Sequence, residues 1–415
     1  MSAYIVEGGR PLDGGLKVHG AKNSVLPILA ACLLVPGECV IRNCPDLSDV
    51  SASLDILRHL GCRAEREGDA VVVDASAPTA WDVPDDLMRE MRSSVIFLGA
   101  ILGRMGQARL CAPGGCELGP RPIDLHLAAI RALGGTVTEE GSGLHCAGAL
   151  HGADIVLSLP SVGATENAML AAVCAVGTTT ITNAAREPEI GDLQDFLCAM
   201  GARVRGAGSS VIVVEGGHPL HGGTYTVMGD RIVAATYLAA AASAGGTVAL
   251  TGVDYRHLST VTAVLKEAGC DVRSDESSIR LTCPGLLRGA RPIRTAPYPG
   301  FPTDAQAPVM AALAKGSGCT VFVENIFESR YRHVDELARM GADIRVEGRV
   351  AVVYGVPRLH GARVRASDLR GGAALVVAAL GAEGQSEIEG LRHIDRGYQD
   401  LEGDLRALGA HIRRI

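Results

Sequence analysis

One short pattern occurs six times along this chain of 415 residues. In each copy an apolar, leucine-rich segment ends at a glycine and passes into an alternating apolar and polar run, as in LAAIRALGGTVT. A glycine after the last helical turn is a common helix stop, and alternation is typical of a half-buried strand. The glycines, about 70 residues apart, are Gly61, Gly134, Gly201, Gly269, Gly341 and Gly409. We therefore expect six copies of one structural unit.

The rest of each unit predicts its class of fold. Alanine-rich helical stretches such as VLPILAACLL, ENAMLAAVCAV, APVMAALA and AALVVAALGA are followed by strand-like runs such as GECVIRN and GTTTITN. Further apolar runs such as AVVVDA, SVIVVEG and VAVVYGV are expected to be strands. Helices that alternate with strands indicate an α/β or α+β fold. The mixed content argues against an all-helical solenoid, and small βαβαββ-type units in compact domains fit better.

Charge and hydropathy patterning exclude several classes of function. The net charge is −7, and the 39 Lys and Arg residues form no cluster of five, which argues against a nucleic-acid partner. No apolar run reaches about 18 residues without polar interruption, and the N-terminus has no signal-peptide pattern. The twelve cysteines are irregularly spaced, with no C-x-x-C, so we expect neither a disulfide framework nor a metal site. A soluble, cytoplasmic protein without a membrane partner is expected.

Charged residues lie at loop positions just before several of the expected helices. They occur in GAKNS, MRSS, GGCELGPRPIDLHL, YPGFPTDAQAP, FESRYRH, ASDLRGGAAL and HIDRGYQD. Arg and Lys side chains that converge on one place indicate an anionic ligand, because guanidinium groups match carboxylate and phosphate geometry. The alternative is that these charges are solvated helix starts, where Asp and Glu act as caps.

These stretches, together with GAKNSVLPILAACLL and NAAREPEI, resemble the UDP-N-acetylglucosamine enolpyruvyl transferases, the MurA family, over essentially the whole chain. The resemblance implies an inside-out α/β barrel fold of two domains, each of three βαβαββ-type units, which agrees with the six repeats. We expect one domain at 1–21 plus 230–415, and a second at 22–229 that carries the Cys116 loop, with a hinge near Glu215–Arg231.

The resemblance also implies a reaction. The enolpyruvyl group of phosphoenolpyruvate is transferred to the 3′-hydroxyl of UDP-N-acetylglucosamine, and phosphate is released, in the first committed step of peptidoglycan synthesis. Both partners are small molecules, and no cofactor or metal is implied. The sequence does not indicate an oligomeric state.

The residues that match the family's motifs divide by role. Cys116 is the implied general acid and the target of fosfomycin, Asp304 is the implied base, and Asp368, beside Leu369, is implied to help move protons. The expected phosphoenolpyruvate contacts are Lys22, Asn23, Arg92, Arg121, Arg330, Arg370 and Arg396. The expected nucleotide-sugar contacts are Asn23, Arg92, Arg121, Pro122, Ile123, Asp124, Leu125, Ser161, Val162, Gly163, Asp304 and Ile326.

The sequence departs from the family's pattern at two places. Family members often have a proline before the Asp-Arg of the hinge and an acid after its isoleucine, whereas this chain reads MGDRIVAAT, with Gly229 and Val233 at those positions. A lysine that some members have just before SVGAT is replaced here, where the chain reads SLPSVGAT. These departures leave open a paralogue that acts on another nucleotide. Two further alternatives are the synthase that acts on shikimate 3-phosphate and a silent nucleotide-sugar-binding regulator. The synthase's Pro-Gly-Ser-Lys-Ser motif is missing near the N-terminus, and a silent regulator would be expected to lack Cys116 or Asp304.

Overall fold

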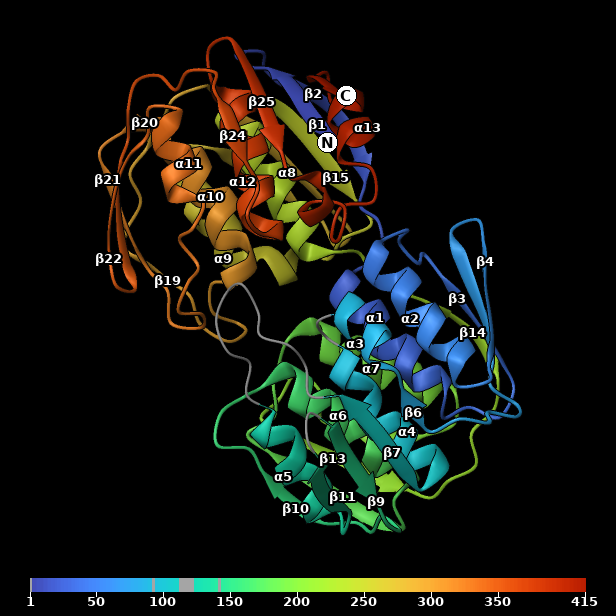
Figure 1. Cartoon of the computed structure of the whole chain (residues 1–415). Coiled ribbons are helices and arrows are strands. Elements are labelled where there is room, and N and C mark those ends of the chain that lie inside the picture. Colours follow the sequence, from blue (N-terminus) through green and yellow to red (C-terminus); the bar gives the residue numbers. More distant parts are fainter. Residues whose placement is uncertain (1, 92–93, 112–122, 141–142) are drawn as a thin grey trace. The chain divides into compact units, whose positions relative to one another are not determined.

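The computed structural model describes residues 2–91, 94–111, 123–140 and 143–415. The chain divides into two compact units (Figure 1). The middle unit runs from Gly20 to Met228, and the terminal unit combines the residues up to His19 with Gly229–Ile415. The terminal unit therefore contains both ends of the chain.

The middle unit consists of three repeats. The elements of the first are β14 (Gly223–Thr226), α1 (Lys22–Cys32), β3 (Glu38–Arg42), α2 (Ser48–His59), β4 (Arg63–Glu67) and β5 (Ala70–Asp74). The elements of the second are β6 (Asp82–Val83), α3 (Asp85–Glu90), η1 (Ser94–Ile96), α4 (Phe97–Met105), β7 (Gln107–Cys111), α5 (Asp124–Ala132), β8 (Thr136–Glu140) and β9 (Gly143–Ala147). The elements of the third are β10 (Asp154–Val156), α6 (Val162–Cys174), β11 (Gly177–Thr182), α7 (Pro188–Ala199), β12 (Arg203–Arg205) and β13 (Val211–Gly216).

The terminal unit also consists of three repeats. The elements of the first are β2 (Leu12–Lys17), α8 (Arg231–Ala244), β15 (Gly246–Thr251), η2 (Tyr255–Leu258), α9 (Ser259–Glu267), β16 (Asp271–Ser274) and β17 (Ser278–Cys283). The elements of the second are β18 (Leu287–Arg288), β19 (Ile293–Arg294), α10 (Thr303–Ala314), β20 (Gly316–Ser317), β21 (Cys319–Val323), α11 (Val334–Arg339), β22 (Asp343–Glu347) and β23 (Val350–Tyr354). The elements of the third are β24 (Arg363–Arg365), α12 (Leu369–Gly381), β25 (Gln385–Glu389), η3 (Leu391–His393), α13 (Leu401–Ala407), β26 (His411–Arg414) and β1 (Ala3–Glu7).

The repeats share one sheet topology. The described residues form six four-stranded sheets, and a short pair, β18–β20, is the remaining sheet. In each four-stranded sheet an edge strand pairs in parallel with its neighbour, and the other two pairings are antiparallel, as in β14–β3–β5–β4. The sixfold repeat and the mixed α/β class are therefore confirmed. None of the sheets formed by the described residues closes on itself.

Three sheets are completed by strands from distant parts of the chain. β14 pairs with β3, β2 pairs with β15, and β1 lies between β25 and β26. β14 and β3 both lie in the middle unit, and β2 and β15 both lie in the terminal unit, so each of these pairings stays within one unit although its strands are far apart in the sequence. β1 and β2, near the N-terminus, and β26, near the C-terminus, are therefore all strands of the terminal unit.

Each of the six glycines of the repeat pattern follows the last helix of its repeat, as expected. Their φ angles lie between 88° and 110°, in the left-handed region that side chains rarely adopt. Glycine reaches this region without steric cost, so the chain leaves each helix and turns directly into the next strand.

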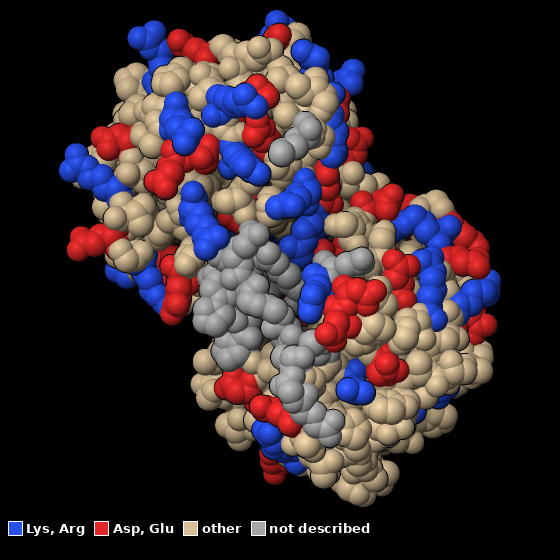
Figure 2. All heavy atoms as spheres, viewed as in Figure 1, with Lys and Arg blue, Asp and Glu red and all other residues tan. Residues whose placement is uncertain are grey.

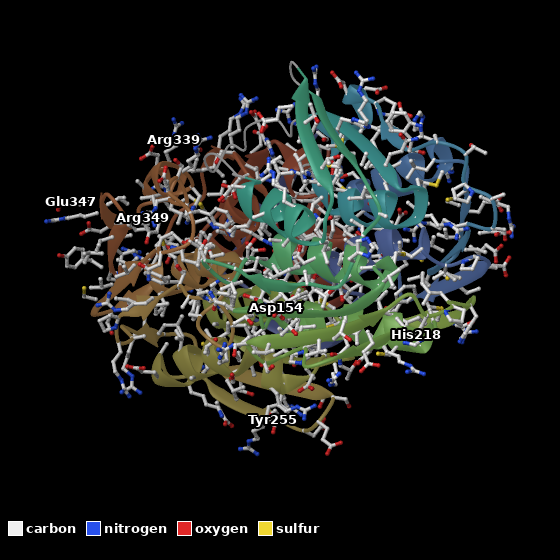
Figure 3. All side chains as sticks on the ribbon, turned by 90° about the horizontal axis from the view of Figure 1, so that it is seen from below. Asp154, His218, Tyr255, Arg339, Glu347 and Arg349 are labelled. Carbon is white, nitrogen blue, oxygen red and sulfur yellow. The ribbon has the colours of Figure 1, made fainter. Side chains whose placement is uncertain are left out.

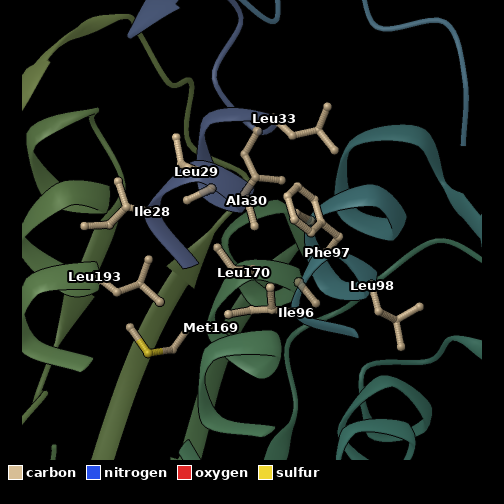
Figure 4. Packing of buried hydrophobic residues seen from close by; sticks show 14 of the residues in the cluster. Ile28, Leu29, Ala30, Leu33, Ile96, Phe97, Leu98, Met169, Leu170 and Leu193 are labelled. Atoms are coloured by element: carbon tan, nitrogen blue, oxygen red, sulfur yellow. The ribbon is translucent and has the colours of Figure 1, made fainter. Parts of the chain in front are cut away.

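The first helix of each repeat lies in the core. In the terminal unit α8, α10 and α12 pack against one another, and in the middle unit α4 packs against α6 and α1. Side chains from α1, α4, α6 and α7 interdigitate in the middle unit's core (Figure 4). A β-carbon on Gly99 of α4 would lie 2.4 Å from the backbone oxygen of Asn167, so glycine permits this close helix contact.

The surface mixes charges of both signs. Figure 2 shows Lys and Arg side chains interspersed with Asp and Glu side chains over the faces of both units that it presents. Arg339, Glu347 and Arg349 are exposed and project from the terminal unit (Figure 3). In the described part of the chain, every helix is too short or too polar to cross a membrane.

Candidate functional site

Asp304 lies between two buried arginines in the terminal unit. Its Oδ1 accepts a hydrogen bond from Nη2 of Arg330 at 2.7 Å, and its Oδ2 accepts one from Nη2 of Arg370 at 3.2 Å. Both arginine side chains are 3% exposed, whereas the Asp304 side chain is 27% exposed. We call Asp304, Arg330 and Arg370 the arginine–aspartate cluster.

Three separate elements supply this cluster. Asp304 is in the first turn of α10, Arg370 is in the first turn of α12, and Arg330 lies in the turn that precedes α11. Because α10 and α12 pack side by side, their N-terminal turns bring the carboxylate and the guanidinium together. The N-cap of α10 is Pro302, and both carboxylate oxygens of Asp304, the second helical residue, accept from arginines on other elements.

The two positive charges dominate the electrostatics of Asp304. Burial disfavours its carboxylate, but the charges and hydrogen bonds of Arg370 and Arg330 outweigh that effect and hold the pKa of Asp304 well below its usual range. Burial likewise disfavours the charge on Arg370, and the carboxylate of Asp304 reverses this effect and raises the pKa of Arg370. Asp304 and Arg370 are therefore both ionised at neutral pH.

Tyr398 fixes the other side of Arg370. Nη1 of Arg370 donates to the Tyr398 hydroxyl at 3.3 Å, and the guanidinium carbon lies 5.7 Å from the centre of the Tyr398 ring. The Tyr398 hydroxyl also lies 2.8 Å from Oγ1 of Thr236 on α8. Thr236 donates its own proton to the Ile232 carbonyl, so Tyr398 donates to Thr236 and accepts from Arg370.

Asp368 is the N-cap of α12. Its Oδ1 accepts from the backbone N–H groups of Arg370 and Gly371, at 3.1 and 2.9 Å. The capping role weighed for the loop carboxylates therefore applies to Asp368. Leu369 begins the helix and packs against the core of the unit.

His333 is a buried imidazole beside the cluster. Burial, together with the nearby charge of Arg330, lowers its pKa to about 4, although the charge of Asp368 acts in the opposite direction. Neither ring nitrogen has a hydrogen-bond partner among the described residues. His333 is therefore neutral at physiological pH.

The remaining predicted residues of the terminal unit lie at its loops. Ile326 follows β21, is 40% exposed, and donates its backbone N–H to Glu324 at 2.8 Å. Arg396 lies after η3 and is half-buried.

In the middle unit Lys22 forms a buried ion pair. It is the first residue of α1, and its Nζ lies 2.6 Å from Oδ2 of Asp49 in the first turn of α2. The two side chains are 10% and 2% exposed. Asn23, the next residue, is exposed. Asp49 therefore holds the ammonium of Lys22 where the two helices begin.

A second carboxylate fixes the start of α1. Asp192 on α7 accepts hydrogen bonds from the hydroxyl of Ser24, from the hydroxyl of Tyr225 at 2.6 Å, and from the backbone N–H of Met228 at 3.2 Å. Burial raises the pKa of Asp192, and these three donors act in the opposite direction. The turn that carries Lys22 and Asn23 is thereby tied to α7.

Ser161, Val162 and Gly163 form the N-terminus of α6. Ser161 is the N-cap, and its Oγ accepts from the backbone N–H of Ala164 at 3.4 Å. The ring of the buried His126 packs here, because a β-carbon on Gly163 would lie 3.0 Å from its Cε1. A helix N-terminus suits an anionic ligand.

His126 has a defined tautomer. Its Nδ1 lies 2.7 Å from Nδ2 of Asn167, which is a donor, so Nδ1 accepts and Nε2 carries the proton. Burial lowers the pKa of His126 to about 4, although the charge of Asp124 opposes this effect. Oδ1 of Asn167 in turn accepts from the backbone N–H of Gly99 at 2.7 Å.

Several predicted residues lie beside or outside the described residues. Ile123 precedes α5, Asp124 is its first residue, and Leu125 packs partly against the core. Cys116, Arg92, Arg121 and Pro122 lie outside the described residues. Among the described residues no group of three or more His, Cys, Asp or Glu side chains is arranged to hold a metal ion.

Sequence reasoning missed the partners of the predicted residues. Asp49, Asp192 and Tyr398 each contact a predicted residue or its immediate neighbour, although none was singled out. Asp49 and Asp192 lie within second helices, where an acidic residue looks like an ordinary surface charge. Tyr398 lies in the stretch HIDRGYQD, so its proximity in the sequence to the predicted Arg396 was the one available signal.

Comparisons with known proteins cover the whole chain. The family model described as EPSP synthase (3-phosphoshikimate 1-carboxyvinyltransferase) matches residues 6–405. UDP-N-acetylglucosamine 1-carboxyvinyltransferase 2 of Caldanaerobacter subterraneus subsp. tengcongensis is 49% identical over 416 residues, which is all of both chains. UDP-N-acetylglucosamine 1-carboxyvinyltransferase 1 of Symbiobacterium thermophilum is 49% identical over 99% of this chain and 95% of its own length.

Two solved structures of similar proteins share the fold of this chain over its whole length. The enolpyruvyl transferase NikO from Streptomyces tendae is similar with a TM-score of 0.89 and 27% identity, over 100% of this chain and 98% of its own. EPSP synthase from Acinetobacter baumannii is similar with a TM-score of 0.76 and 19% identity, over the whole of both chains, which supports the fold alone.

Proposed function

This chain belongs to the EPSP synthase family, and from that premise we propose that it catalyses the reaction of the UDP-N-acetylglucosamine 1-carboxyvinyltransferases. The single observation that carries the proposal is the 49% identity over the full length of an enzyme of that name. The chain is a transferase: it moves the enolpyruvyl group of phosphoenolpyruvate to the 3′-hydroxyl of UDP-N-acetylglucosamine and releases phosphate, in peptidoglycan synthesis.

The chemistry makes three demands on the protein. A proton must reach the methylene carbon of phosphoenolpyruvate while the sugar oxygen bonds to the adjacent carbon and loses its own proton. The resulting tetrahedral adduct then loses phosphate and a proton from the new methyl group, which restores the double bond. Throughout, the carboxylate and phosphate charges must be held by fixed cations, which is commonly the largest contribution to catalysis.

We assign the terminal unit to the base and to part of the cation set. Asp304 accepts the sugar hydroxyl proton, and Arg330 and Arg370 bind an anionic group of phosphoenolpyruvate. Support comes from their buried guanidiniums, which meet at the partly exposed carboxylate of Asp304. Arg396 is assigned to the same ligand. Asp368 both caps α12 and is assigned to proton transfer near the reacting carbon.

We assign the middle unit to the phosphate and the nucleotide. Lys22, held by Asp49, contacts the phosphate of phosphoenolpyruvate, together with Asn23 and Arg92. Cys116 is the proposed general acid. The nucleotide sugar is assigned to Arg121, Pro122, Ile123, Asp124, Leu125, Ser161, Val162, Gly163 and, from the terminal unit, Ile326. The N-terminus of α6, which Ser161 begins, supports a diphosphate contact, because the N-terminal end of a helix favours an anion.

We propose a cytoplasmic location. The ten cysteines whose side chains the structure describes are all free thiols, which suits a reducing compartment. Several of them are buried and act as small apolar side chains.

The decisive experiment measures inorganic phosphate released from phosphoenolpyruvate by the purified protein. Separate reactions supply UDP-N-acetylglucosamine, UMP or shikimate 3-phosphate. We expect release with the nucleotide sugar alone. Release only with UMP or only with shikimate 3-phosphate would identify one of the alternative acceptors, and no release with any of them would favour the silent regulator.

A substitution tests the proposed acid. The variant C116S should lose at least about 10² in turnover, and C116D, which restores an ionisable acid, should recover part of it. The variant C319S changes an exposed thiol and is the matched control. Full activity of C116S across the pH range would remove Cys116 from the mechanism.

A further inference from the structure

Asp304 is ion-paired with two arginines, and this pairing opposes its proposed role as a general base. A general base must accept a proton, yet protonation of this carboxyl would leave two buried guanidinium charges without their counter-ion. Such unpaired buried charges are strongly unfavourable. In the arrangement described here, Asp304 is therefore a poor base.

We propose that Arg330 and Arg370 hold Asp304 inactive as a base until an anionic group of the donor substrate binds the two guanidiniums and takes the place of the carboxylate as their counter-ion. The inference rests on the proposed function, because it concerns the base of that reaction. It adds a requirement to the site: the donor must be bound before the acceptor hydroxyl can lose its proton.

The hydrogen bonds of the two arginines support such an exchange. Nη2 of Arg330 is shared between Asp304 and the carbonyl of Thr303, at 2.7 and 3.1 Å. The buried Nε–H groups of Arg330 and Arg370 have no acceptor in the described part of the chain. Guanidiniums have five donors in a planar fork, so both arginines retain capacity that a planar carboxylate or a phosphate matches.

The exposure of the three side chains also indicates that the carboxylate of Asp304 is the part of the cluster that an incoming anion displaces. Asp304 is 27% exposed, so its carboxylate is the part of the cluster that an incoming ligand meets first. Arg370 is held by Tyr398 and, electrostatically, by Asp230, and Arg330 is held by the carbonyl of Thr303. The carboxylate is thus the partner that moves or changes its contacts most readily.

Other charged groups around the cluster define what a test must control. His333 lies near Arg330, Asp368 caps the helix of Arg370, and Glu324 accepts a hydrogen bond from Thr303 at 3.0 Å. Of these, His333 is the group that an added anion would most directly help to protonate. The variant H333Q separates proton uptake by His333 from proton uptake by Asp304.

Competition for the arginines gives a test that does not require turnover. Sulfate, a dianion that does not titrate in this range, is added to the protein in a calorimeter. The variant D304N removes the internal competitor, so it should bind sulfate about tenfold more tightly than the wild-type protein, although its turnover falls. The variant D335N makes the same charge change at an exposed position and should stay within about twofold of wild type.

A double variant localises the effect. D304N/R370Q should lose the gain in sulfate affinity, because one of the two arginines is missing. Equal sulfate affinity of D304N and D335N would overturn the proposal. So would a gain that persists in D304N/R370Q, because the sulfate would then bind elsewhere.

Proton uptake gives a second measurement on the wild-type protein, which also serves if D304N does not fold. Sulfate titrations at pH 5 in two buffers of different ionisation enthalpy report the protons taken up on binding. We expect uptake in the wild type and in H333Q. The absence of uptake in the wild type, or its loss in H333Q, would overturn the assignment to Asp304.

The phosphate-release assay separates this inference from the proposed function. An inactive wild-type protein that still shows the difference in sulfate affinity would refute the reaction and retain the coupling. An active wild-type protein whose D304N variant binds sulfate no more tightly would refute the coupling and retain the reaction.

Discussion

Nζ of Lys22 lies 2.6 Å from Oδ2 of Asp49, and both side chains are almost wholly withdrawn from solvent. Ion pairs of this kind contribute little as a pair, but removal of one partner is costly because the other charge stays buried. Asp49 is thus a positioning residue: it fixes the ammonium that we assign to the phosphate of phosphoenolpyruvate.

The variant D49N should be strongly destabilised. We expect its free energy of unfolding to fall by about 3–5 kcal/mol, because the charge of Lys22 loses its counter-ion. Urea titration measures the change. The matched control is D55N on the same helix, where Asp55 pairs with Arg58 at 46% exposure and should contribute less than about 1 kcal/mol. Equal stability of the two variants would contradict the structural role of Asp49.

Tyr398 provides a test of how Arg370 is positioned. The variant Y398F removes the acceptor for Nη1 of Arg370 and the donor to Thr236. We expect kcat/KM for phosphoenolpyruvate to fall about tenfold, with a smaller change for the nucleotide sugar, because the guanidinium is less well oriented. Steady-state kinetics with each substrate varied gives this split. Y255F, at an exposed tyrosine, should behave as wild type, and equal losses for both substrates would argue against a specific effect on Arg370.

His126 links the stability of the middle unit to pH. Its pKa is about 4 in the folded protein, because burial disfavours the imidazolium, against about 6.5 in an unfolded chain. The folded state therefore binds fewer protons, and stability is lost as the pH falls from 6.5 toward 4. The loss at pH 4.5 should be about 2–3 kcal/mol.

Urea unfolding at pH 7 and pH 4.5 measures this contribution. The difference between the two pH values should be smaller in H126N by that amount, whereas replacement of the exposed His151 should leave it as in wild type. A pH dependence in H126N that matches the wild type would show that His126 is not responsible.

Glu166 links the stability of the middle unit to pH in the opposite direction from His126, because its contribution is lost as the pH rises. Its side chain is buried, and burial together with the negative charges of Glu189 and Glu187 raises its pKa well above the usual range. The folded state therefore binds the extra proton, and this contribution to stability is present below the unfolded pKa and is lost as the pH rises through the folded pKa.

The neutral variant E166Q should remove that loss. We expect it to match the wild type near pH 5 and to exceed it by more than about 1 kcal/mol at pH 9. Thermal or urea unfolding at the two pH values measures the change, with E67Q at an exposed position as the control. A variant that is less stable than wild type at pH 9 would indicate that Glu166 is ionised and paired.

The residues of the candidate site could be proposed from the sequence, but their geometry could not. Asp304, Arg330 and Arg370 were each expected from the motifs that contain them, yet they lie in three separate stretches of the chain. Their mutual contacts depend on the packing of α10 against α12 and on the turn before α11. The partners Asp49, Asp192 and Tyr398 had no motif to mark them, because a single acid or tyrosine in a helix is common.

The sequence by itself determined the local units of this protein. Each of the six glycines supplies a positive φ where a helix must turn into a strand, and that preference is a property of the residue and its neighbours. Alternating apolar residues similarly determine which face of a strand is buried. These short-range effects explain why the six repeats and the mixed α/β class could be predicted.

Only the tertiary structure decided which strands complete which sheets and which charges meet. β14 joins β3, and β1 lies between β25 and β26, across most of the length of the chain. Such pairings depend on how whole helices and sheets pack, because the loss of entropy on closing a long loop varies little with its length and so does not select one partner. For the same reason the ion pair of Lys22 with Asp49, and the two arginines on Asp304, became visible only in the folded chain.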